Sequence, residues 1–396
     1  MGKIEDKTLS LIQFVGPIKE AWLNRIRATG AEPIHPGFGF LSENPGFAKR
    51  LEEEGIGWIG PNAFAIDAMG GDVGPEVMVG GAAAARADFP DLRFVFFGDE
   101  AAIRNEIAKH KALADNVEVV HADRVISGED KPSQALRRSK DSSMGMAIAA
   151  VKAGEAEAVL SAGNTGALMA IAKVALRTME GIERPAISAL LPTLGKTDVV
   201  MLDLGANVDS EPKHLLQFAL MGQAVVRAVD GLSAPRVALL NIGEEDIKGN
   251  EQIKEAATLM QQAADLNYAG FVEGNGIFVG DVDVVVCDGF VGNVSLKTME
   301  GAASMIGGMI REEAGRSLLR KLSGLFALPL LRGLKHRLDP ERYNGASLVG
   351  LNGIVVKSHG GTGVEGFVSA LEVAVLEAER NVPALIRDAL APADAS

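Results

Sequence analysis

The chain has 396 residues, of which 47% are hydrophobic, so it is long enough for one large domain or two smaller ones with a substantial core. Its formal net charge of −13 argues against nucleic-acid binding, and the single Cys287 excludes an intrachain disulfide and a cysteine-based zinc cluster. A lone cysteine fits a reducing cytoplasm. No apolar run approaches the roughly 20 residues of a membrane-spanning helix, and the N-terminus shows no apolar signal-peptide core.

The first part of the chain does not share the pattern of the remaining residues. It carries the run His35-Pro-Gly-Phe-Gly-Phe-Leu-Ser-Glu-Asn44 and, later, Gly55-Ile-Gly-Trp-Ile-Gly-Pro61. These runs resemble the N-terminal domain of biotin carboxylases over about residues 22–62. Carboxylation needs an ATP-binding module, and no ATP-grasp glycine loop occurs later in the chain. The sequence therefore predicts a non-functional fragment over residues 1–63 and a separate domain over 64–396.

Strands and helices alternate in the second part. The predicted strands are Phe64–Asp67, Leu92–Gly98, Val117–His121, Ala156–Ser161, Val199–Asp203, Val237–Asn241 and Val282–Cys287. Helical patterns separate them, among them Ala101–Ala112, Ser142–Ala153 and Pro212–Val229. This alternation predicts an α/β fold with a mostly parallel, doubly wound sheet that is covered on both faces.

Five of the predicted strands open into loops rich in glycine and polar residues. These loops are Asp67–Asp72, Ser161–Gly166, Asp203–Asp209, Gly243–Asn250 and Asp288–Asn293. In a parallel sheet, ligands bind just beyond the carboxyl ends of the strands. Glycines let the backbone approach a ligand closely, while Asn and Thr side chains donate hydrogen bonds without adding charge. Such a floor suits phosphate and a carbonyl that becomes an oxyanion.

Other chemistries have weaker support in the residues. The pattern Gly361-Thr-Gly-Val-Glu-Gly366 has no later strand to complete a dinucleotide-binding unit, so it predicts a tight turn. No Walker A motif occurs, and the six histidines lack metal-ligand spacing, so we expect no metal site. Cys287 ends an apolar run and is predicted to be a packing residue. Direct attack by a bound oxyanion substrate therefore fits better than an acyl-enzyme.

One segment contrasts with the acidic chain as a whole. No acidic residue occurs between Glu313 and Asp339, and the segment interleaves leucines and phenylalanine with Arg316, Arg320, Lys321, Arg332, Lys335 and Arg337. Pro329 divides it into two helical pieces. Two interpretations stay open, and both can hold together: a basic amphipathic surface on an anionic membrane, or a helical hairpin that buries its leucines in a dimer interface.

Residues from about 65 to 396 resemble the PlsX-type bacterial phosphate acyltransferases. The runs that carry this resemblance are Ile66–Asp72, His121–Asp123, Ser142–Met144, Ser161–Met169, Leu204–Asp209, Glu245–Asn250, Asp288–Val294, Gly345–Leu348 and Ser358–Gly360. They span nearly the whole domain in order.

The resemblance implies an activity and partners. It implies reversible transfer of a fatty acyl group from acyl carrier protein to inorganic phosphate, without a cofactor, to give acyl phosphate for phospholipid synthesis. It further implies an isocitrate/isopropylmalate-dehydrogenase-like fold, a homodimer, and a helical insertion over about 296–340 for dimer or membrane contact. The expected location is cytoplasmic, at the inner face of the cell membrane, with a downstream glycerol-phosphate acyltransferase as a further partner.

The resemblance also assigns roles to individual residues. It makes Lys248 and Asn293 catalytic candidates that hold phosphate or stabilise the tetrahedral transition state. Seven looser candidates for the site lining are Asp67, Gly70, Gly71, Asp72, Asn164, Thr165 and Asn207. The candidates for membrane contact are Arg316, Arg320, Lys321, Leu325 and Phe326. A dehydrogenase-like activity on a different small molecule and an inactive membrane-associated scaffold are the alternatives.

Overall fold

The computed structural model describes residues 63–113, 116–195, 197–316 and 339–390, together with the single positions 327, 333 and 337. Phe64–Pro90 and Phe94–Ser396 form one unit, and Met1–Ala63 with Asp91–Arg93 forms another. The predicted N-terminal fragment lies outside the described residues except for Ala63, so the boundary near residue 64 stays a prediction.

The described part of the chain forms one sheet of eleven strands. In chain order these are β1 (Ala63–Asp67), β2 (Arg93–Gly98), β3 (Val117–His121), β4 (Ala158–Ser161), β5 (Ala186–Leu191), β6 (Val199–Leu202), β7 (Val237–Leu240), β8 (Tyr268–Val272), β9 (Val284–Val286), β10 (Ala346–Val349) and β11 (Ile354–Lys357). Their order across the sheet is β3-β2-β1-β4-β11-β10-β5-β6-β9-β7-β8. The strands expected from apolar runs are all present, most of them one or two residues shorter.

The sheet consists of two parallel groups that run in opposite directions. Strand β11 is parallel to β4, and β4 to β1, while β6, β9, β7 and β8 are parallel to one another. Three antiparallel pairings, β11 with β10, β10 with β5 and β5 with β6, join the groups. The predicted α/β fold with a mostly parallel sheet is confirmed, but the five glycine loops do not all leave the sheet in one direction.

The register nevertheless brings the two sets of strand ends to the same height. Ser347 of β10 pairs with both Ser188 of β5 and Val356 of β11, and Ser188 pairs with Leu202 of β6. The last residue of β6 is therefore level with the residue before the end of β11. Loops that leave β6 and β11 in opposite directions thus begin close to each other in the middle of the sheet.

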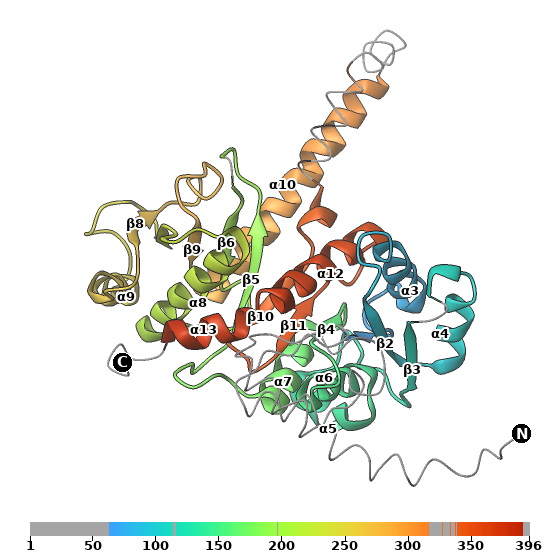
Figure 1. The fold of residues 1–396 in the computed structure, drawn as a ribbon. Helices are drawn as coiled ribbons and strands as arrows, with labels where there is room; N and C mark the ends of the chain where they lie inside the picture. Colours follow the sequence, from blue (N-terminus) through green and yellow to red (C-terminus); the bar gives the residue numbers. More distant parts are fainter. Residues whose placement is uncertain are drawn as a thin grey trace, which may run out of the picture. The chain divides into compact units, whose positions relative to one another are not determined.

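Helices cover both faces of the sheet (Figure 1). Those described are α3 (Gly74–Ala85), α4 (Glu100–Ile107), α5 (Pro132–Arg138), α6 (Ser143–Ala153), α7 (Thr165–Leu176), α8 (Pro212–Asp230), α9 (Glu251–Gln262), α10 (Gly289–Gly315), α12 (Val364–Glu379) and α13 (Val382–Leu390). Short 3-10 turns occur at Lys111–Leu113, Ser139–Asp141 and Pro340–Tyr343.

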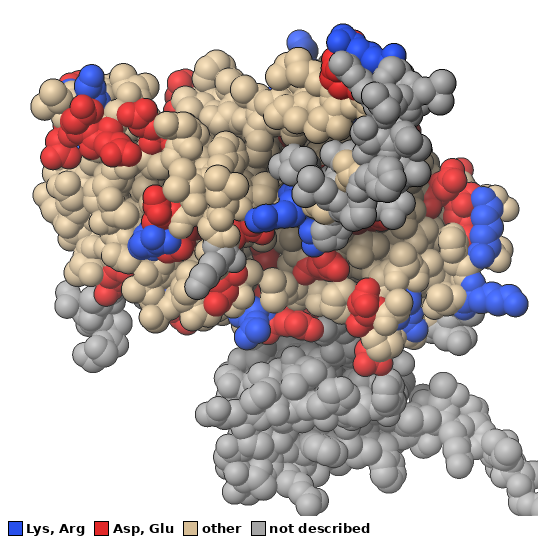
Figure 2. Space-filling view, turned by 90° about the horizontal axis from the view of Figure 1, so that it is seen from above, with Lys and Arg blue, Asp and Glu red and all other residues tan. Residues whose placement is uncertain are grey.

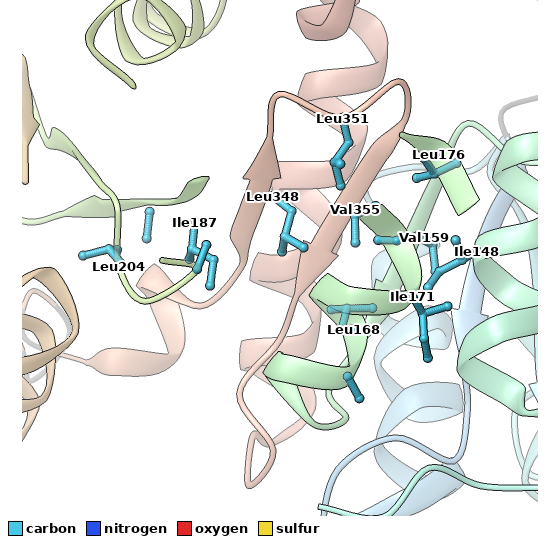
Figure 3. Packing of buried hydrophobic residues seen from close by; sticks show 14 of the residues in the cluster. Ile148, Val159, Leu168, Ile171, Leu176, Ile187, Leu204, Leu348, Leu351 and Val355 are labelled. Atoms are coloured by element: carbon cyan, nitrogen blue, oxygen red, sulfur yellow. The ribbon is translucent and has the colours of Figure 1, made fainter. Parts of the chain in front are cut away.

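The core is split between the two faces by the alternation of side chains along each strand. Val285 belongs to one buried cluster, whereas its neighbours Val284 and Val286 belong to the other. The first cluster crosses the junction of the two strand groups: Figure 3 shows Leu348 and Val355 between Ile187 on one side and Ile148 of α6 on the other. Packing on this face therefore holds the two groups of strands together.

Helix α10 extends away from the sheet (Figure 1). It begins at Gly289 and so includes most of the strand-end loop predicted over Asp288–Asn293. The predicted hairpin over about 296–340 starts inside this single helix, and its second half falls mostly outside the described residues. Among the described helices, none is long and apolar enough to cross a membrane. On the face in Figure 2, basic side chains are scattered among acidic ones.

Candidate active site

A cavity of about 420 Å³ lies between α10, β5, the start of β10 and the end of β11. The register sets the ends of β6 and β11 at nearly the same height in the sheet. The cavity lies there, where the loops after these two strands begin. Of the predicted site residues, Asn293 and Thr165 line the cavity. It is therefore the candidate active site of the described part of the chain.

Two of its walls, α10 and β5, carry a row of apolar side chains, and α10 also contributes the polar residues Lys297, Glu300 and Ser304. Helix α10 contributes Asn293, Leu296, Met299 and Ala303 at helical spacing, and β5 contributes Ile187, Ala189 and Leu191, which alternate and so share one face. The ten helical steps from Asn293 to Ala303 span roughly 15 Å. The cavity thus combines a long apolar wall with an amide at one end.

Asn293 is held against the loop after β6. Its Nδ2 donates a hydrogen bond to the carbonyl oxygen of Leu204 at 3.2 Å. Gly205 has a positive φ of 124°, and a Cβ there would lie 2.7 Å from the same nitrogen. Only glycine therefore allows this close approach. Asn293 is exposed and lines the cavity, and its second amide hydrogen and its Oδ1 have no hydrogen-bond partner among the described residues.

The loop that holds Asn293 is fixed by the buried carboxylate of Asp203. Its Oδ1 accepts hydrogen bonds from the main-chain nitrogens of Ile187 (2.9 Å), Gly205 (3.2 Å) and Ala206 (2.9 Å). Its Oδ2 accepts two more, both from Asn207. Burial raises the pKa of Asp203, and these donors oppose that effect. The carboxylate thereby joins β5 to the loop.

Asn207 serves this loop and does not line the cavity. Its Nδ2 donates to the carbonyl oxygen of Pro185 and to Asp203 Oδ2, both at 2.9 Å. Both of its amide hydrogens are therefore used inside the protein. In the structure the side chain of Asn207 shapes the loop, and its predicted role in lining the site stays a prediction.

The glycine loop after β1 does not line the cavity either: Asp67 and Gly70 are buried, whereas Gly71 and Asp72 are exposed. Asp67 is 1% exposed, and its Oδ2 accepts a hydrogen bond of 2.6 Å from the Ser161 hydroxyl. A Cβ on Gly70 would lie 2.7 Å from Asp67 Oδ2, and one on Gly71, whose φ is 83°, would lie 2.7 Å from the carbonyl oxygen of Gly360. The main-chain nitrogen of Asp72 donates to that same oxygen at 2.9 Å. Four predicted lining residues therefore pack the loops after β1, β4 and β11 together.

Asn164 and Thr165, which are adjacent in sequence, have different positions. Asn164 is the N-cap of α7: its Oδ1 accepts from the nitrogen of Ala167 at 2.9 Å, and its Nδ2 donates to the carbonyl oxygen of Gly128 at 2.6 Å. Thr165 lines the cavity. Capping thus accounts for Asn164, and Thr165 remains a candidate for ligand contact.

Lys248, the other predicted catalytic residue, lies outside the cavity wall. It is exposed in the loop after β7, where its own carbonyl oxygen accepts a hydrogen bond of 3.3 Å from the Asn241 side chain. Lys248 is not among the residues that line the cavity. Its catalytic role therefore still depends on the resemblance alone.

Sequence reasoning does not single out Lys357, although it lines the cavity together with Ser358 and His359. The run Ser358–Gly360 carries part of the family resemblance, but Lys357 stands just before it, at the end of a short apolar strand. The signal in the sequence that could have identified Lys357 is a positively charged residue directly after a run of three buried apolar residues, Ile354–Val356.

The remaining predictions concern residues outside the cavity. Arg316 is exposed and forms ion pairs with Glu312 and Glu313. Arg320, Lys321, Leu325 and Phe326 lie outside the described residues.

Cys287 is buried as predicted, and burial raises the pKa of its thiol well above the ordinary value. Within the described ranges, no cluster of His, Cys, Asp or Glu could hold a metal ion.

Two solved structures share this arrangement of strands and helices. The EutD phosphotransacetylase from Staphylococcus aureus aligns with a TM-score of 0.53 at 17% identity, and a phosphotransacetylase from Streptococcus pyogenes with a TM-score of 0.54 at 18% identity. Each alignment covers 80% of this chain and 94% of the solved one. The chain therefore has the α/β fold of the phosphotransacetylases.

Sequence comparison places the chain more narrowly. The family model described as "Fatty acid synthesis protein" matches residues 63–385. A "Phosphate acyltransferase" of Alcanivorax borkumensis is 62% identical over 83% of this chain and 97% of its own length, and one of Legionella pneumophila (strain Corby) is 52% identical over 82% and 95%. The chain belongs to this phosphate acyltransferase family.

The N-terminal part has a separate likeness. The model of the biotin carboxylase N-terminal domain matches residues 12–66, which confirms the resemblance and extends it on both sides of 22–62. The two family matches overlap at residues 63–66, within β1. The first strand of the described sheet is thus the place where the two likenesses meet.

The packing of α10 on the loop after β6 can be tested with two glycines of the same helix. A Cβ on Gly292 would lie 1.9 Å from the carbonyl oxygen of Asp203, whereas a Cβ on Gly301 has no atom within 4 Å. We expect Gly292→Ala to lower the free energy of unfolding by about 2–3 kcal/mol, because the helix must move away from the loop. Gly301→Ala should be neutral or stabilise by about 0.5–1 kcal/mol.

The measurement is urea denaturation of the full chain, with the Gly301→Ala variant as the matched control. Equal midpoints for Gly292→Ala and the wild type would show that α10 does not press on Asp203 in solution.

Proposed function

We propose that this chain transfers a fatty acyl group reversibly from the thioester of acyl carrier protein to inorganic phosphate, giving acyl phosphate for phospholipid synthesis. The observation that carries the proposal is the cavity of a phosphate acyltransferase family member, with a long apolar wall beside Asn293 and the cation Lys357. A fatty acyl chain needs an apolar wall to bind against, and a phosphoryl group needs a cation. No metal or redox cofactor is required by this reaction.

The chemistry follows from positioning and electrostatic stabilisation. An oxygen of HPO₄²⁻ attacks the thioester carbonyl carbon, and the carbon–sulfur bond breaks. The products are the acyl phosphate dianion and the carrier-protein thiol, whose sulfur receives the proton that the phosphate carried. Asn293 donates an amide hydrogen to phosphate or to the carbonyl oxygen as negative charge develops there. The family resemblance, and not a place in the cavity wall, supports Lys248 as the residue that neutralises charge in the tetrahedral transition state.

The dehydrogenase-like activity and the inactive scaffold have no support among the relatives. The isocitrate/isopropylmalate-dehydrogenase-like relation of the fold and the helical hairpin remain proposals. They are supported, respectively, by the sequence resemblance and by the length of α10, which continues to Gly315.

The far part of α10 supports two proposed contacts. Met305, Ile306 and Met309 are exposed large hydrophobic side chains on this helix, and the basic segment predicted from Arg316 onward comes directly after it. We propose that this region contacts a second copy of the chain and the anionic inner face of the cell membrane. A cytoplasmic, peripherally membrane-bound enzyme could then pass acyl phosphate to a glycerol-phosphate acyltransferase.

The proposed reaction makes release of the carrier protein depend on phosphate. With a long-chain acyl carrier protein as substrate, we expect free carrier protein to appear only when phosphate is added. Asn293→Ala and Lys248→Ala should each lower kcat/KM by roughly 100-fold, the usual effect of losing one transition-state donor. Lys254→Ala, which removes a partly exposed lysine of α9 that pairs with Glu251, is the control and should behave as the wild type.

Release at the same rate without phosphate contradicts the proposed reaction. Wild-type rates in the Asn293 and Lys248 variants would instead leave the reaction standing and remove those two assignments.

The apolar wall predicts that the far end of the cavity sets the acyl chain length. Ala303 lines the cavity, and its neighbour Ala302 does not. Ala303→Trp should fill the far end, so the ratio of kcat/KM for a sixteen-carbon to an eight-carbon acyl chain should fall about 10-fold or more. Ala302→Trp is the matched control on the same turn, and an equal change in both variants would place the acyl chain elsewhere.

The proposed membrane contact predicts binding to anionic vesicles. The full chain should sediment with vesicles that contain phosphatidylglycerol and not with pure phosphatidylcholine. Reversal of Arg320 and Lys321 to Glu should weaken this binding about 10-fold or more, because each basic residue near the surface is worth about 1 kcal/mol. The same charge change at Arg104 and Lys109, in α4 and just after it, is the control. Unchanged sedimentation of the Arg320/Lys321 variant would favour the interpretation as a dimer interface alone.

A further inference from the structure

Lys357 ends β11 next to two other polar strand ends. In the register of the three neighbouring parallel strands, Ser161 of β4 pairs with both Asp67 of β1 and Lys357 of β11. The side chains of residues that are paired in this way stand on the same face of a sheet. The end of β11 thus carries a lysine on the face where Asp67 and Ser161 are hydrogen-bonded at 2.6 Å.

The ammonium group of Lys357 has only main-chain acceptors near it. Nζ donates hydrogen bonds to the carbonyl oxygens of Ala162, at 3.3 Å, and Ser358. No carboxylate of the described residues lies within 4.0 Å of Nζ, the distance that defines the ion pairs of the chain. A partly buried cation without an ion-pair partner is costly, so most such groups are paired.

The two carboxylates that line the cavity are engaged by other groups. Glu300 forms an ion pair with Lys297 at 2.8 Å, and Glu341 accepts a hydrogen bond of 3.0 Å from the main-chain nitrogen of Gly363. Among the described residues of the cavity wall, Lys357 is therefore the cation whose charge is left for a ligand. Asn293 lines the same cavity and supplies a neutral donor.

We infer that Lys357 binds the phosphate dianion in this cavity and places it for attack on the thioester carbonyl. The inference rests on the proposed function and adds a phosphate-binding residue to it. Two of the ammonium hydrogens are held by Ala162 and Ser358, so the third is left for a ligand in the cavity that Lys357 lines. Asp67 and Asp72 act on Lys357 only from beyond ion-pair distance, so a bound dianion supplies the direct partner that the described residues do not provide.

Lys357 acts by charge and position, and it stays protonated through the reaction. Its hydrogen bond holds one phosphate oxygen while another forms the bond to the carbonyl carbon. As the carbon–sulfur bond breaks, the proton that HPO₄²⁻ carried passes to the thiolate sulfur. No proton leaves Lys357, so the atoms and charges of the transfer balance without it.

Burial and then the charge of Lys297 lower the pKa of Lys357 to about 8, while Asp67 and Asp72 oppose this shift. The other titratable groups of the cavity wall are Glu300, Glu341, Tyr343 and His359. Because the charged form of Lys357 predominates below pH 8, phosphate binding should be strong there and weaken as the pH rises through about 8. An arginine at this position would keep its charge throughout that range.

The test compares Lys357→Met and Lys357→Arg with the wild type in the phosphate-dependent release of carrier protein. Lys357→Met should raise KM for phosphate roughly 10- to 100-fold, the usual value of a hydrogen bond to a charged group, and leave KM for acyl carrier protein within about twofold. Lys357→Arg should restore most of the phosphate affinity and remove its loss above pH 8. Lys173→Met, at an exposed position of α7, is the control for removing a lysine.

A general loss of stability is checked by thermal unfolding of each variant. Met is flexible, apolar and similar in length, so Lys357→Met should melt at or above the wild-type temperature. If that variant does not fold, Lys357→Arg and the pH dependence of inorganic phosphate binding to the wild type, measured by calorimetry, decide the matter.

The outcomes separate this inference from the proposed function. If the wild type releases carrier protein at the same rate with and without phosphate, the proposed reaction is wrong. Phosphate-dependent release with an unchanged KM for phosphate in Lys357→Met, or phosphate binding to the wild type that is constant from pH 7 to 9, overturns the role of Lys357 alone.

Discussion

The carboxylate of Asp203 is the interaction on which the site depends. It lies where β5 and β6 meet, between the two groups of strands, and it accepts five hydrogen bonds from β5 and from its own loop. These bonds fix the loop whose Leu204 carbonyl holds Asn293. Because a buried carboxylate is stable only when its oxygens are satisfied, the loop has little freedom to move while the carboxylate stays ionised.

The second constraint is the antiparallel link through β10. It reverses the direction of the strands and, by its register, sets the ends of β6 and β11 at one height. The cavity is therefore a product of pairing between distant segments, since Asn293 and Lys357 come from opposite strand groups. A sheet with all strands in one direction would leave the same loops along one edge instead.

Much of the fold could be predicted from the sequence, because apolar runs that end in glycine identify buried strands well. The direction of a short strand such as Ala186–Leu191 could not, since apolar composition carries no sign of its partner. Among the site residues, Asn207 and Asn293 look alike in the sequence, as each lies in a glycine loop after a strand. The side-chain amides of these two residues differ only in which backbone carbonyl groups lie close enough to accept hydrogen bonds from them. The local sequence pattern does not show the positions of those carbonyl groups. Lys357 could not be singled out from the sequence for the same reason. Whether a carboxylate lies within reach of its ammonium group depends on how three strands, β1, β4 and β11, pair with one another.

Helix α10 also has a mechanical consequence. Its 27 residues span about 40 Å, and its first turn is pinned where Gly292 meets Asp203. A rigid rod held near one end acts as a lever. A tilt of about 10° about that point would displace the far end by about 7 Å and Asn293 by less than about 1 Å over a helix of this length. Whatever the outer end touches can therefore shift by the width of a side chain while the geometry around the amide stays nearly unchanged.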